Sequence, residues 1–169
     1  MKAENNSMEL ISTHVCKSSD VGFHGNLFGG QMLAWLDEAA AAYVCQMCDS
    51  PQMVTVKVDT VHFRKPVPLG SVLTVEAKVS RAFTTSMEVF LDVWIENIKS
   101  KKREKVNEAI YTFVAVNKDG QPVKIPPIYP ETEVEKRRYE GALRRRQLSL
   151  ILAGKLKPED ASELKAIFD

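Results

Sequence analysis

The segment His24-Gly-Asn-Leu-Phe-Gly-Gly-Gln-Met-Leu-Ala-Trp-Leu-Asp-Glu-Ala-Ala-Ala-Ala42 joins a glycine-rich loop to a run of helix-forming residues. Apolar residues recur at three- and four-residue intervals from Gly29 to about Cys48. This spacing predicts one helix of about 20 residues, roughly 30 Å long. Because almost its whole circumference is apolar, we expect the helix to be buried on most sides.

Alternating apolar and polar residues follow this helix and predict strands. We expect a short first strand near residues 8–16 and longer strands at 54–59, 73–79, 87–95 and 110–116. Turn-forming residues between them favour antiparallel neighbours. One long apolar helix with several amphipathic strands and no second internal helix is an α+β arrangement, in which an antiparallel sheet wraps around a long central helix. The small alanines at 39–42 would let the strands approach that helix closely.

Four prolines between Pro122 and Pro130 end the strand pattern. We therefore expect one globular domain over residues 1–125, and a Pro-rich connection with a basic helical tail over residues 126–169. Thr132-Glu-Val-Glu135 resembles a capping box at the start of a tail helix, and Pro158 should open a shorter helix that ends near Phe168. The cations of the tail favour a mostly solvated helix face: Lys136, Arg137, Arg138, Arg144, Arg145 and Arg146.

The overall composition argues against several classes of partner. The chain has 23 basic and 22 acidic residues, so its formal net charge of +1 does not favour a nucleic acid or an anionic membrane. The N-terminal residues lack the apolar core of a secretory signal, and no apolar run approaches the roughly 20 residues of a membrane helix. Three cysteines form no paired framework, which suits the cytoplasm. Cys45 and Cys48 lack further ligands nearby, so we expect a structural role and no metal site.

The loop Gly25-Asn-Leu-Phe-Gly-Gly30 could supply an oxyanion site. The first N–H groups of a helix have no partner within the helix, and glycines let a substrate come close to them. Such groups can hold a carbonyl oxygen as it becomes an oxyanion. A tight turn before a helix is the alternative that glycine alone would favour.

Asp37 is the candidate catalytic acid. A carboxylate beside Leu33 and Ala40 in mid-helix is costly to bury unless it is paired, hydrogen-bonded or used in chemistry. Glu38 has similar apolar neighbours, and either acid could instead pair with an arginine across a subunit contact. Asp37 lies eight residues after Gly29, about 12 Å along a helix, so one carbonyl group cannot touch both in one chain. We therefore expect an active site that crosses a dimer interface.

Further motifs carry a family resemblance: Val54-Thr-Val-Lys-Val-Asp59, Phe63-Arg-Lys-Pro66, Leu69-Gly-Ser71, Thr85-Ser-Met-Glu88, Tyr111-Thr-Phe-Val-Ala-Val116, Pro126-Pro127 and Arg137-Arg-Tyr-Glu140. Together with the glycine loop, they resemble the hotdog-fold acyl-CoA thioesterases over most of the chain. In that family a Gly-Gly pair opens the central helix, and an aspartate eight residues beyond the first Gly is catalytic. Gly29, Gly30 and Asp37 match these positions.

The resemblance implies hydrolysis of an acyl-CoA to a free acid and coenzyme A, with no cofactor apart from the coenzyme A of the substrate. Asp37 would act as a general base on water, or would attack the thioester itself to form an anhydride. The N–H groups near Phe28 to Gly30 would stabilise the tetrahedral intermediate. The resemblance also implies a homodimer whose two sheets join, and a hexamer built as a trimer of dimers.

Gly22 departs from the family pattern. Members often carry an asparagine or a glutamine 15 residues before the catalytic acid, where it helps to position the water or the thioester. His24 and Asn26 are the nearby polar side chains that could replace this function. For His24, a turn residue bonded to the backbone is the alternative.

Coenzyme A brings phosphates, which need basic or hydrogen-bonding partners. The candidates are Arg64 and Lys65 at a strand end, Arg81 before a turn, and Thr85 and Ser86 in that turn. Thr85 and Ser86 fit a family position near the coenzyme, and an ordinary turn is the alternative for them. The tail arginines could also contribute.

Two other functions are compatible with part of this pattern. A hotdog hydratase or dehydratase would pair His24 with Asp37 or Glu38, but the His-Phe-Pro arrangement of the dehydratases is absent. A non-catalytic module that binds or senses acyl-CoA would keep the fold without needing an unpaired buried acid. The thioesterase accounts for more of the residues than either alternative does.

Overall fold

The glycine loop leads into the helix α1 (Gly29–Met47) in a computed structural model, which describes residues 9–48, 52–97 and 100–168. This confirms the predicted helix. One side of α1 is buried against the sheet. The opposite side is exposed and carries four small residues and two larger polar ones: Gly30, Ala34, Glu38, Ala42, Cys45 and Gln46. Burial on most sides is therefore wrong for the single chain, because the sheet curves around only part of the helix.

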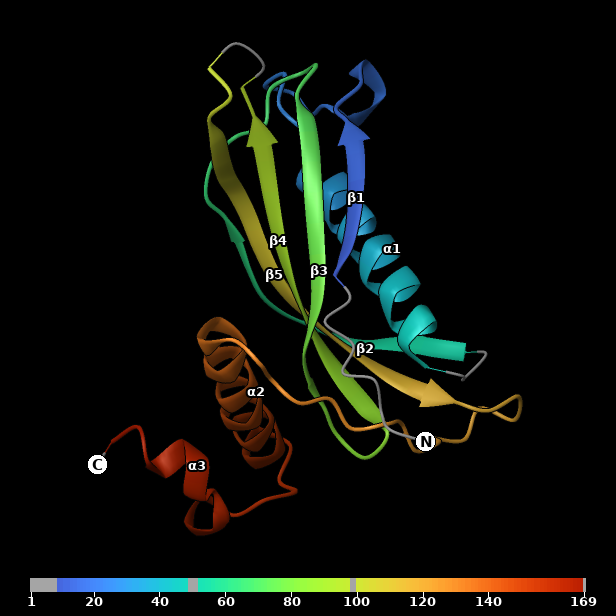
Figure 1. Cartoon of the computed structure of the whole chain (residues 1–169), viewed down its shortest axis with the longest axis vertical. Coiled ribbons are helices and arrows are strands. Elements are labelled where there is room, and N and C mark those ends of the chain that lie inside the picture. The colour runs from blue at the N-terminus through green and yellow to red at the C-terminus, as the bar shows by residue number, and fades with distance from the viewer. Residues whose placement is uncertain (1–8, 49–51, 98–99, 169) are drawn as a thin grey trace.

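Five strands form one antiparallel sheet in the order β1-β3-β4-β5-β2. They are β1 (Leu10–Val15), β2 (Gln52–Phe63), β3 (Val72–Ala82), β4 (Ser86–Glu96) and β5 (Arg103–Val116). The sheet curves around α1, as Figure 1 shows. This is the predicted α+β hotdog arrangement, and the strands are longer than the alternating segments that predicted them.

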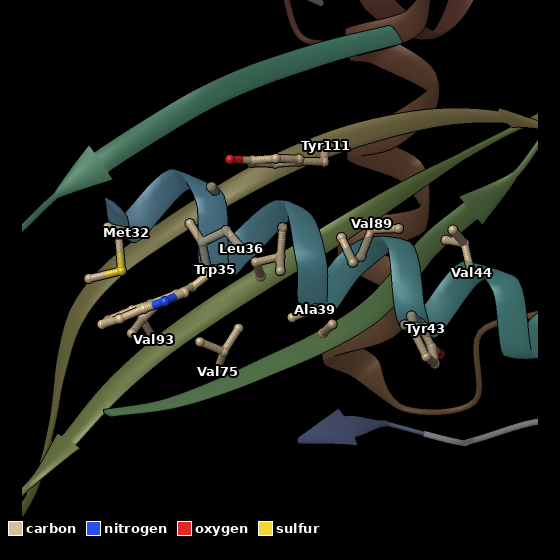
Figure 2. Close-up of a cluster of buried hydrophobic side chains, with 14 of the residues drawn as sticks. Met32, Trp35, Leu36, Ala39, Tyr43, Val44, Val75, Val89, Val93 and Tyr111 are labelled. Atoms are coloured by element: carbon tan, nitrogen blue, oxygen red, sulfur yellow. The ribbon is translucent and has the colours of Figure 1, made fainter. Parts of the chain in front are cut away.

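The main hydrophobic core lies between α1 and the inner face of the sheet. Figure 2 shows Leu36 and Ala39 of α1 beside Val75, Val89 and Val93, all of which are buried. Ala39 and Ala40 are almost completely covered, whereas the alanines at 41 and 42 are half-buried and exposed. Two of the four predicted small residues therefore allow the close approach of the sheet, and the other two lie toward the open side of the helix.

The C-terminal tail packs on the other face of the sheet. Its main element is α2 (Glu133–Leu152), which begins at the predicted capping box: Thr132 accepts from the N–H of Glu135 at 3.2 Å, and Glu135 accepts from the N–H of Thr132 at 2.9 Å. The predicted last helix is shorter, with a 3-10 turn at Pro158–Asp160 followed by α3 (Ser162–Lys165). No helix within the described ranges is long and apolar enough to cross a membrane.

Arginines of α2 hold the tail to the sheet. Arg145 donates two hydrogen bonds to Glu88, at 2.9 and 2.7 Å, and Arg138 donates to Asp92 at 2.6 Å. Both carboxylates are almost completely buried, on the strand positions that alternate with the core valines. A solvated position is therefore wrong for these two arginines, because the sheet presents partners that the local sequence of the tail does not reveal. Lys136, Arg137 and Arg146 of the same cluster are exposed, as predicted.

Candidate active site

Backbone hydrogen bonds hold the loop before α1 in place. The N–H of Gly22 donates to the carbonyl of Asn26 at 2.9 Å, and the N–H of Gly25 donates back to Gly22 at 3.1 Å. Gly25 has a φ of 69°, a conformation that favours glycine. The N–H groups of Leu27 and Phe28 donate to Val67 and Asp20 at 2.7 and 2.8 Å. The loop therefore delivers the chain to the start of α1 along a defined path.

The first turn of α1 leaves donors available. Met32 is the first residue of the helix whose N–H bonds back along the chain, to Phe28 at 3.1 Å. The N–H groups of Gly29, Gly30 and Gln31 have no partner in the described part of the chain, and Phe28 supplies no side-chain cap. These groups lie at the positive end of the helix dipole, where they can receive an oxyanion.

Aromatic rings lie against both positions of the glycine pair. A Cβ atom at Gly30 would come within 2.5 Å of Phe28 Cε1, and one at Gly29 within 3.3 Å of Phe63 Cζ. Both phenylalanines are more than half exposed in the single chain. Phe28 of the loop and Phe63 at the end of β2 therefore lie beside the free N–H groups.

Asp37 lies half-buried on the side of α1 that faces β2. The hydroxyl of Thr55 donates to Asp37 Oδ1 at 2.8 Å, and no cation among the described residues pairs with this carboxylate. Glu38 is exposed on the side toward β1: burial lowers the pKa of His14, and the charge of Glu38 opposes that shift. The two candidate acids therefore lie on different sides of α1, and of the two only Asp37 accepts a hydrogen bond from a half-buried hydroxyl group among the described residues.

Tyr111 supports the helix next to Asp37. Its hydroxyl donates to the carbonyl of Leu33 at 3.1 Å. Burial raises the pKa of Tyr111 to about 12, and the negative charge of Asp37 adds to the rise. Neither Thr55 nor Tyr111 was predicted as a site residue. The sequence could have indicated them only as polar side chains on the helix-facing side of a strand. That side cannot be assigned before the strand register is known.

His24 and Asn26 lie on the loop that precedes α1. The side-chain amide of Asn26 donates to the carbonyl of His24 at 3.2 Å, so it braces the loop. The His24 side chain is exposed and forms no hydrogen bond, ion pair or ring contact with the other described residues. Asn26 and His24 are the candidates to replace the amide side chain that Gly22 lacks. Of these two side chains, only that of His24 forms no hydrogen bond within the described residues.

The candidate coenzyme-binding residues fall into two groups. Arg64 and Lys65 follow Phe63, which pairs with Asn107, whereas Ser86 pairs with Val114. Seven residues of β5 separate these partners, about 23 Å along the strand. Within one chain the two groups therefore cannot bind the same phosphate.

Most of these side chains already have partners. Arg81 stacks on the ring of Tyr139 at 4.0 Å and donates to its carbonyl at 3.3 Å, and the buried Ser86 hydroxyl accepts from Arg146 at 3.2 Å. The half-buried Thr85 lies beside Ser86 at the start of β4. Arg81 and Ser86 therefore contact the tail helix in this chain.

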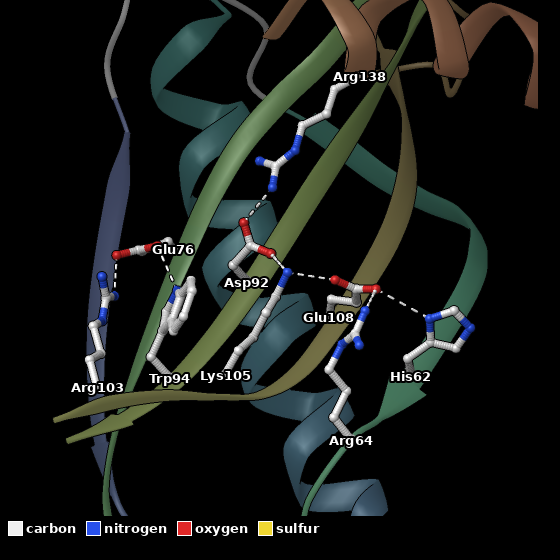
Figure 3. Close-up of polar contacts among 9 residues, drawn as sticks. All are labelled: His62, Arg64, Glu76, Asp92, Trp94, Arg103, Lys105, Glu108 and Arg138. Atoms are coloured by element: carbon white, nitrogen blue, oxygen red, sulfur yellow. Dashed lines mark hydrogen bonds and ion pairs between the residues drawn. The ribbon is translucent and has the colours of Figure 1, made fainter. Parts of the chain in front are cut away.

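Arg64 belongs to a charged network on the outer face of the sheet. It donates to Glu108 at 2.5 Å, and Lys105 and His62 contact the same carboxylate at 2.5 and 3.2 Å (Figure 3). Burial raises the pKa of Glu108, but the hydrogen bonds from these three side chains outweigh it and lower the pKa to about 2. Lys65 pairs separately with Glu104. No group of three or more metal-ligating side chains occurs within the described ranges.

Replacing Glu108 by glutamine should make the stability of the protein less dependent on acid pH. Because the folded-state pKa is depressed, the carboxylate stabilises the protein above its unfolded pKa, and this contribution is lost as the pH falls from about 5 toward 2. We expect Glu108→Gln to lower the free energy of unfolding by about 2 kcal/mol at pH 7 and by much less at pH 3. Urea unfolding at both pH values measures this; an equal loss at both would contradict it. Glu104→Gln is the matched exposed control.

Comparison with known proteins places the chain in the thioesterase superfamily. Residues 24–102 match the family model of the thioesterase superfamily. The chain is 33% identical over 149 residues to the uncharacterized acyl-CoA thioester hydrolase YkhA of Bacillus subtilis. The aligned region covers 82% of this chain and 86% of that protein.

Two solved structures resemble the chain over most of its length. One is an acyl-CoA hydrolase from Staphylococcus aureus in complex with butyryl coenzyme A, coenzyme A and coenzyme A disulfide, with a TM-score of 0.79, 33% identity and coverage of 87% of this chain and 91% of that one. The other is an apo-hexameric acyl-CoA thioesterase, with a TM-score of 0.81, 34% identity and coverage of 86% and 92%. Variants of the staphylococcal enzyme have alanine in place of an aspartate, a threonine or an asparagine, and that asparagine precedes the aspartate by 15 residues.

Proposed function

The chain belongs to the thioesterase superfamily, and we propose on that basis that it hydrolyses acyl-CoA thioesters to a free carboxylic acid and coenzyme A. The observation that carries the proposal is the Asp37 carboxylate, which lies half-buried on α1 with the Thr55 hydroxyl as its hydrogen-bond partner. Oδ1 of this carboxylate accepts from Thr55, and its second oxygen has no hydrogen-bond partner among the described residues and is available for chemistry.

Asp37 has two possible roles in the hydrolysis. As a general base it takes a proton from a water molecule whose oxygen attacks the thioester carbon, and the carbon–sulfur bond then breaks. The departing thiolate receives the proton from Asp37. As a nucleophile, Asp37 would displace the thiolate to form an anhydride that water then hydrolyses. In both cases Thr55 orients the carboxylate, and the N–H groups of Gly29 and Gly30 receive the developing oxyanion.

The two halves of the site should come from different subunits. Gly29 and Asp37 are about 12 Å apart along α1, which is too far for one carbonyl group to contact both. β2 is an edge strand, and Val54, Val56 and Val58 on it are 46%, 54% and 47% exposed. An exposed apolar edge strand is a template for pairing with another chain. We infer a homodimer in which two β2 strands pair, and a hexamer of three such dimers, since the similar thioesterase is hexameric.

Release of free thiol from acyl-CoA tests the proposal. Wild-type protein would be assayed with saturated acyl-CoA thioesters from acetyl to palmitoyl, and thiol release well above the uncatalysed rate is expected for at least one chain length. This series also defines the chain-length preference. Binding of coenzyme A without thiol release would favour a sensing module, and water addition to an enoyl-CoA would favour a hydratase.

Gly22 should accept an asparagine and gain activity from it. The replaced asparagine of the staphylococcal enzyme stands 15 residues before the replaced aspartate, as Gly22 stands before Asp37. The φ of Gly22 is not positive, and a Cβ there would meet only Phe28 Cδ2, at 3.8 Å. We expect Gly22→Asn to raise kcat about three- to tenfold, because the amide adds a donor near the reacting group. Gly22→Ala adds the Cβ without the amide and should leave kcat unchanged; equal effects of the two would refute this role.

A further inference from the structure

Asn107 on β5 is a buried polar side chain that the mechanism above does not use. It is 0% exposed, and neither its Oδ1 nor its Nδ2 atom has a hydrogen-bond partner within residues 9–48, 52–97 and 100–168. Burying a carboxamide without partners destabilises a protein, and such groups are rare in native structures. An aliphatic residue would fit the same position at lower cost, so the amide needs a reason to be there.

The position of Asn107 connects it with the start of α1. It lies four residues before Tyr111 on β5, so both side chains point to the helix-facing side of the sheet. Its neighbours across the strands are Phe63 and Val93. The Phe63 ring lies 3.3 Å from the Cβ position of Gly29, and Val93 packs in the same core as Met32 (Figure 2). The carboxamide is therefore at the sheet positions that support the first turn of α1.

That first turn has little other polar support from side chains. Phe28 gives no side-chain cap, and Gly22 has no side chain to offer. The amide of Asn26 is directed to the carbonyl of His24. The N–H groups of Gly29, Gly30 and Gln31 must nevertheless keep a fixed direction if they are to receive an oxyanion, because displacements of about 1 Å can lower a rate about a hundredfold.

We propose that Asn107 is a positioning residue of the hydrolytic site, which holds a buried water molecule between its carboxamide and the backbone at the start of α1. This inference rests on the proposed thioesterase function. A carboxamide offers both donors and an acceptor, and a buried water typically makes about three hydrogen bonds to such groups. The water satisfies the amide and fixes the turn whose N–H groups face the substrate. Asn107 itself does not touch the thioester.

The test compares two replacements whose side chains have the same shape as each other, Asn107→Val and Asn107→Thr. Both side chains are β-branched and suit a strand, and they differ only in a methyl group and a hydroxyl group. We expect the valine variant to raise Tm by about 3 °C and to lower kcat about tenfold at nearly unchanged KM. The threonine variant, which can still bind the water, should keep kcat within about threefold of the wild type. Asn107→Ala and Asn107→Ser form a second pair, in case the branched side chains overfill the site.

Equal kcat values for the two members of a pair would overturn the proposal, whatever their stabilities. A parallel loss of kcat and Tm in both members would also overturn it, because a purely structural residue behaves in that way. These outcomes are separate from a failure of the proposed function. If the wild type itself releases no thiol from any acyl-CoA, the thioesterase assignment is wrong. If the wild type is active but the valine and threonine variants have equal kcat values, only the role of Asn107 is wrong.

Discussion

Asp37→Asn is expected to lower kcat for thioester hydrolysis about a thousandfold while the protein still binds coenzyme A. Asparagine has the same shape and can still accept the hydrogen bond that Thr55 donates to Asp37 Oδ1 at 2.8 Å. It can neither take a proton from water nor form an anhydride. The loss therefore measures the chemistry of the carboxylate rather than its packing. Thiol release under saturating acyl-CoA gives kcat, and calorimetric titration with coenzyme A gives the affinity.

Glu38→Gln is the matched control, because Glu38 is the adjacent acid of the same helix and is exposed toward β1. We expect it to change kcat by less than about threefold. If Glu38→Gln abolished activity and Asp37→Asn did not, the assignment of the acid would be reversed. If both variants hydrolysed acyl-CoA like the wild type, neither acid would act in the reaction, and the role of the first-turn N–H groups would have to be tested alone.

The helix and the strands were predictable because local periodicity is a direct consequence of which face is buried. α1 and β3 show this plainly, since exposed or half-buried residues alternate there with buried ones at the expected spacing. The expected strand at 54–59 was too short, since β2 continues to Phe63. A register shift between Asp59 and His62 coincides with two successive polar residues, Asp59 and Thr60, which interrupt the alternation on which the prediction depended.

The contacts that define the site could not be predicted in the same way. Thr55 and Asp37 are 18 residues apart, and only the packing of β2 against α1 brings them together. The same reason explains the error about the tail. Arg138 and Arg145 look like solvated cations on a polar helix, yet they bind Asp92 and Glu88, which are 46 and 57 residues away. The tail sequence does not indicate that the Glu88 and Asp92 carboxylates of β4 lie opposite these two arginines.

The separation of the two halves of the site along α1 leads to the second large effect. If the loop of one subunit serves Asp37 of the other, a variant damaged in the loop and a variant damaged at the acid should complement each other. Gly30→Val is a suitable loop variant, because its Cβ would come within 2.5 Å of Phe28 Cε1, so the exposed Phe28 ring has to turn away and the valine methyl groups take its place beside the first-turn N–H groups. The φ of Gly30 is not positive, so the backbone accepts valine.

Each variant alone should have at most about one hundredth of the wild-type activity. In a random equimolar mixture of subunits, about one site in four would combine an intact loop with an intact Asp37, so about a quarter of the wild-type activity should return. Co-expression with two affinity tags, followed by tandem purification, would isolate the mixed dimer, which should have about half.

Lysines at Val54 and Val56, two exposed residues of the β2 edge, provide the control for this recovery. If the subunits meet along that edge, adding Val54→Lys and Val56→Lys to both partners should prevent both the mixed dimer and the return of activity. Val15→Lys, at an equally exposed valine of β1, should prevent neither. A mixed dimer that forms but stays as inactive as its parents would mean that the loop and Asp37 of the same chain act together, and the shared site would have to be abandoned.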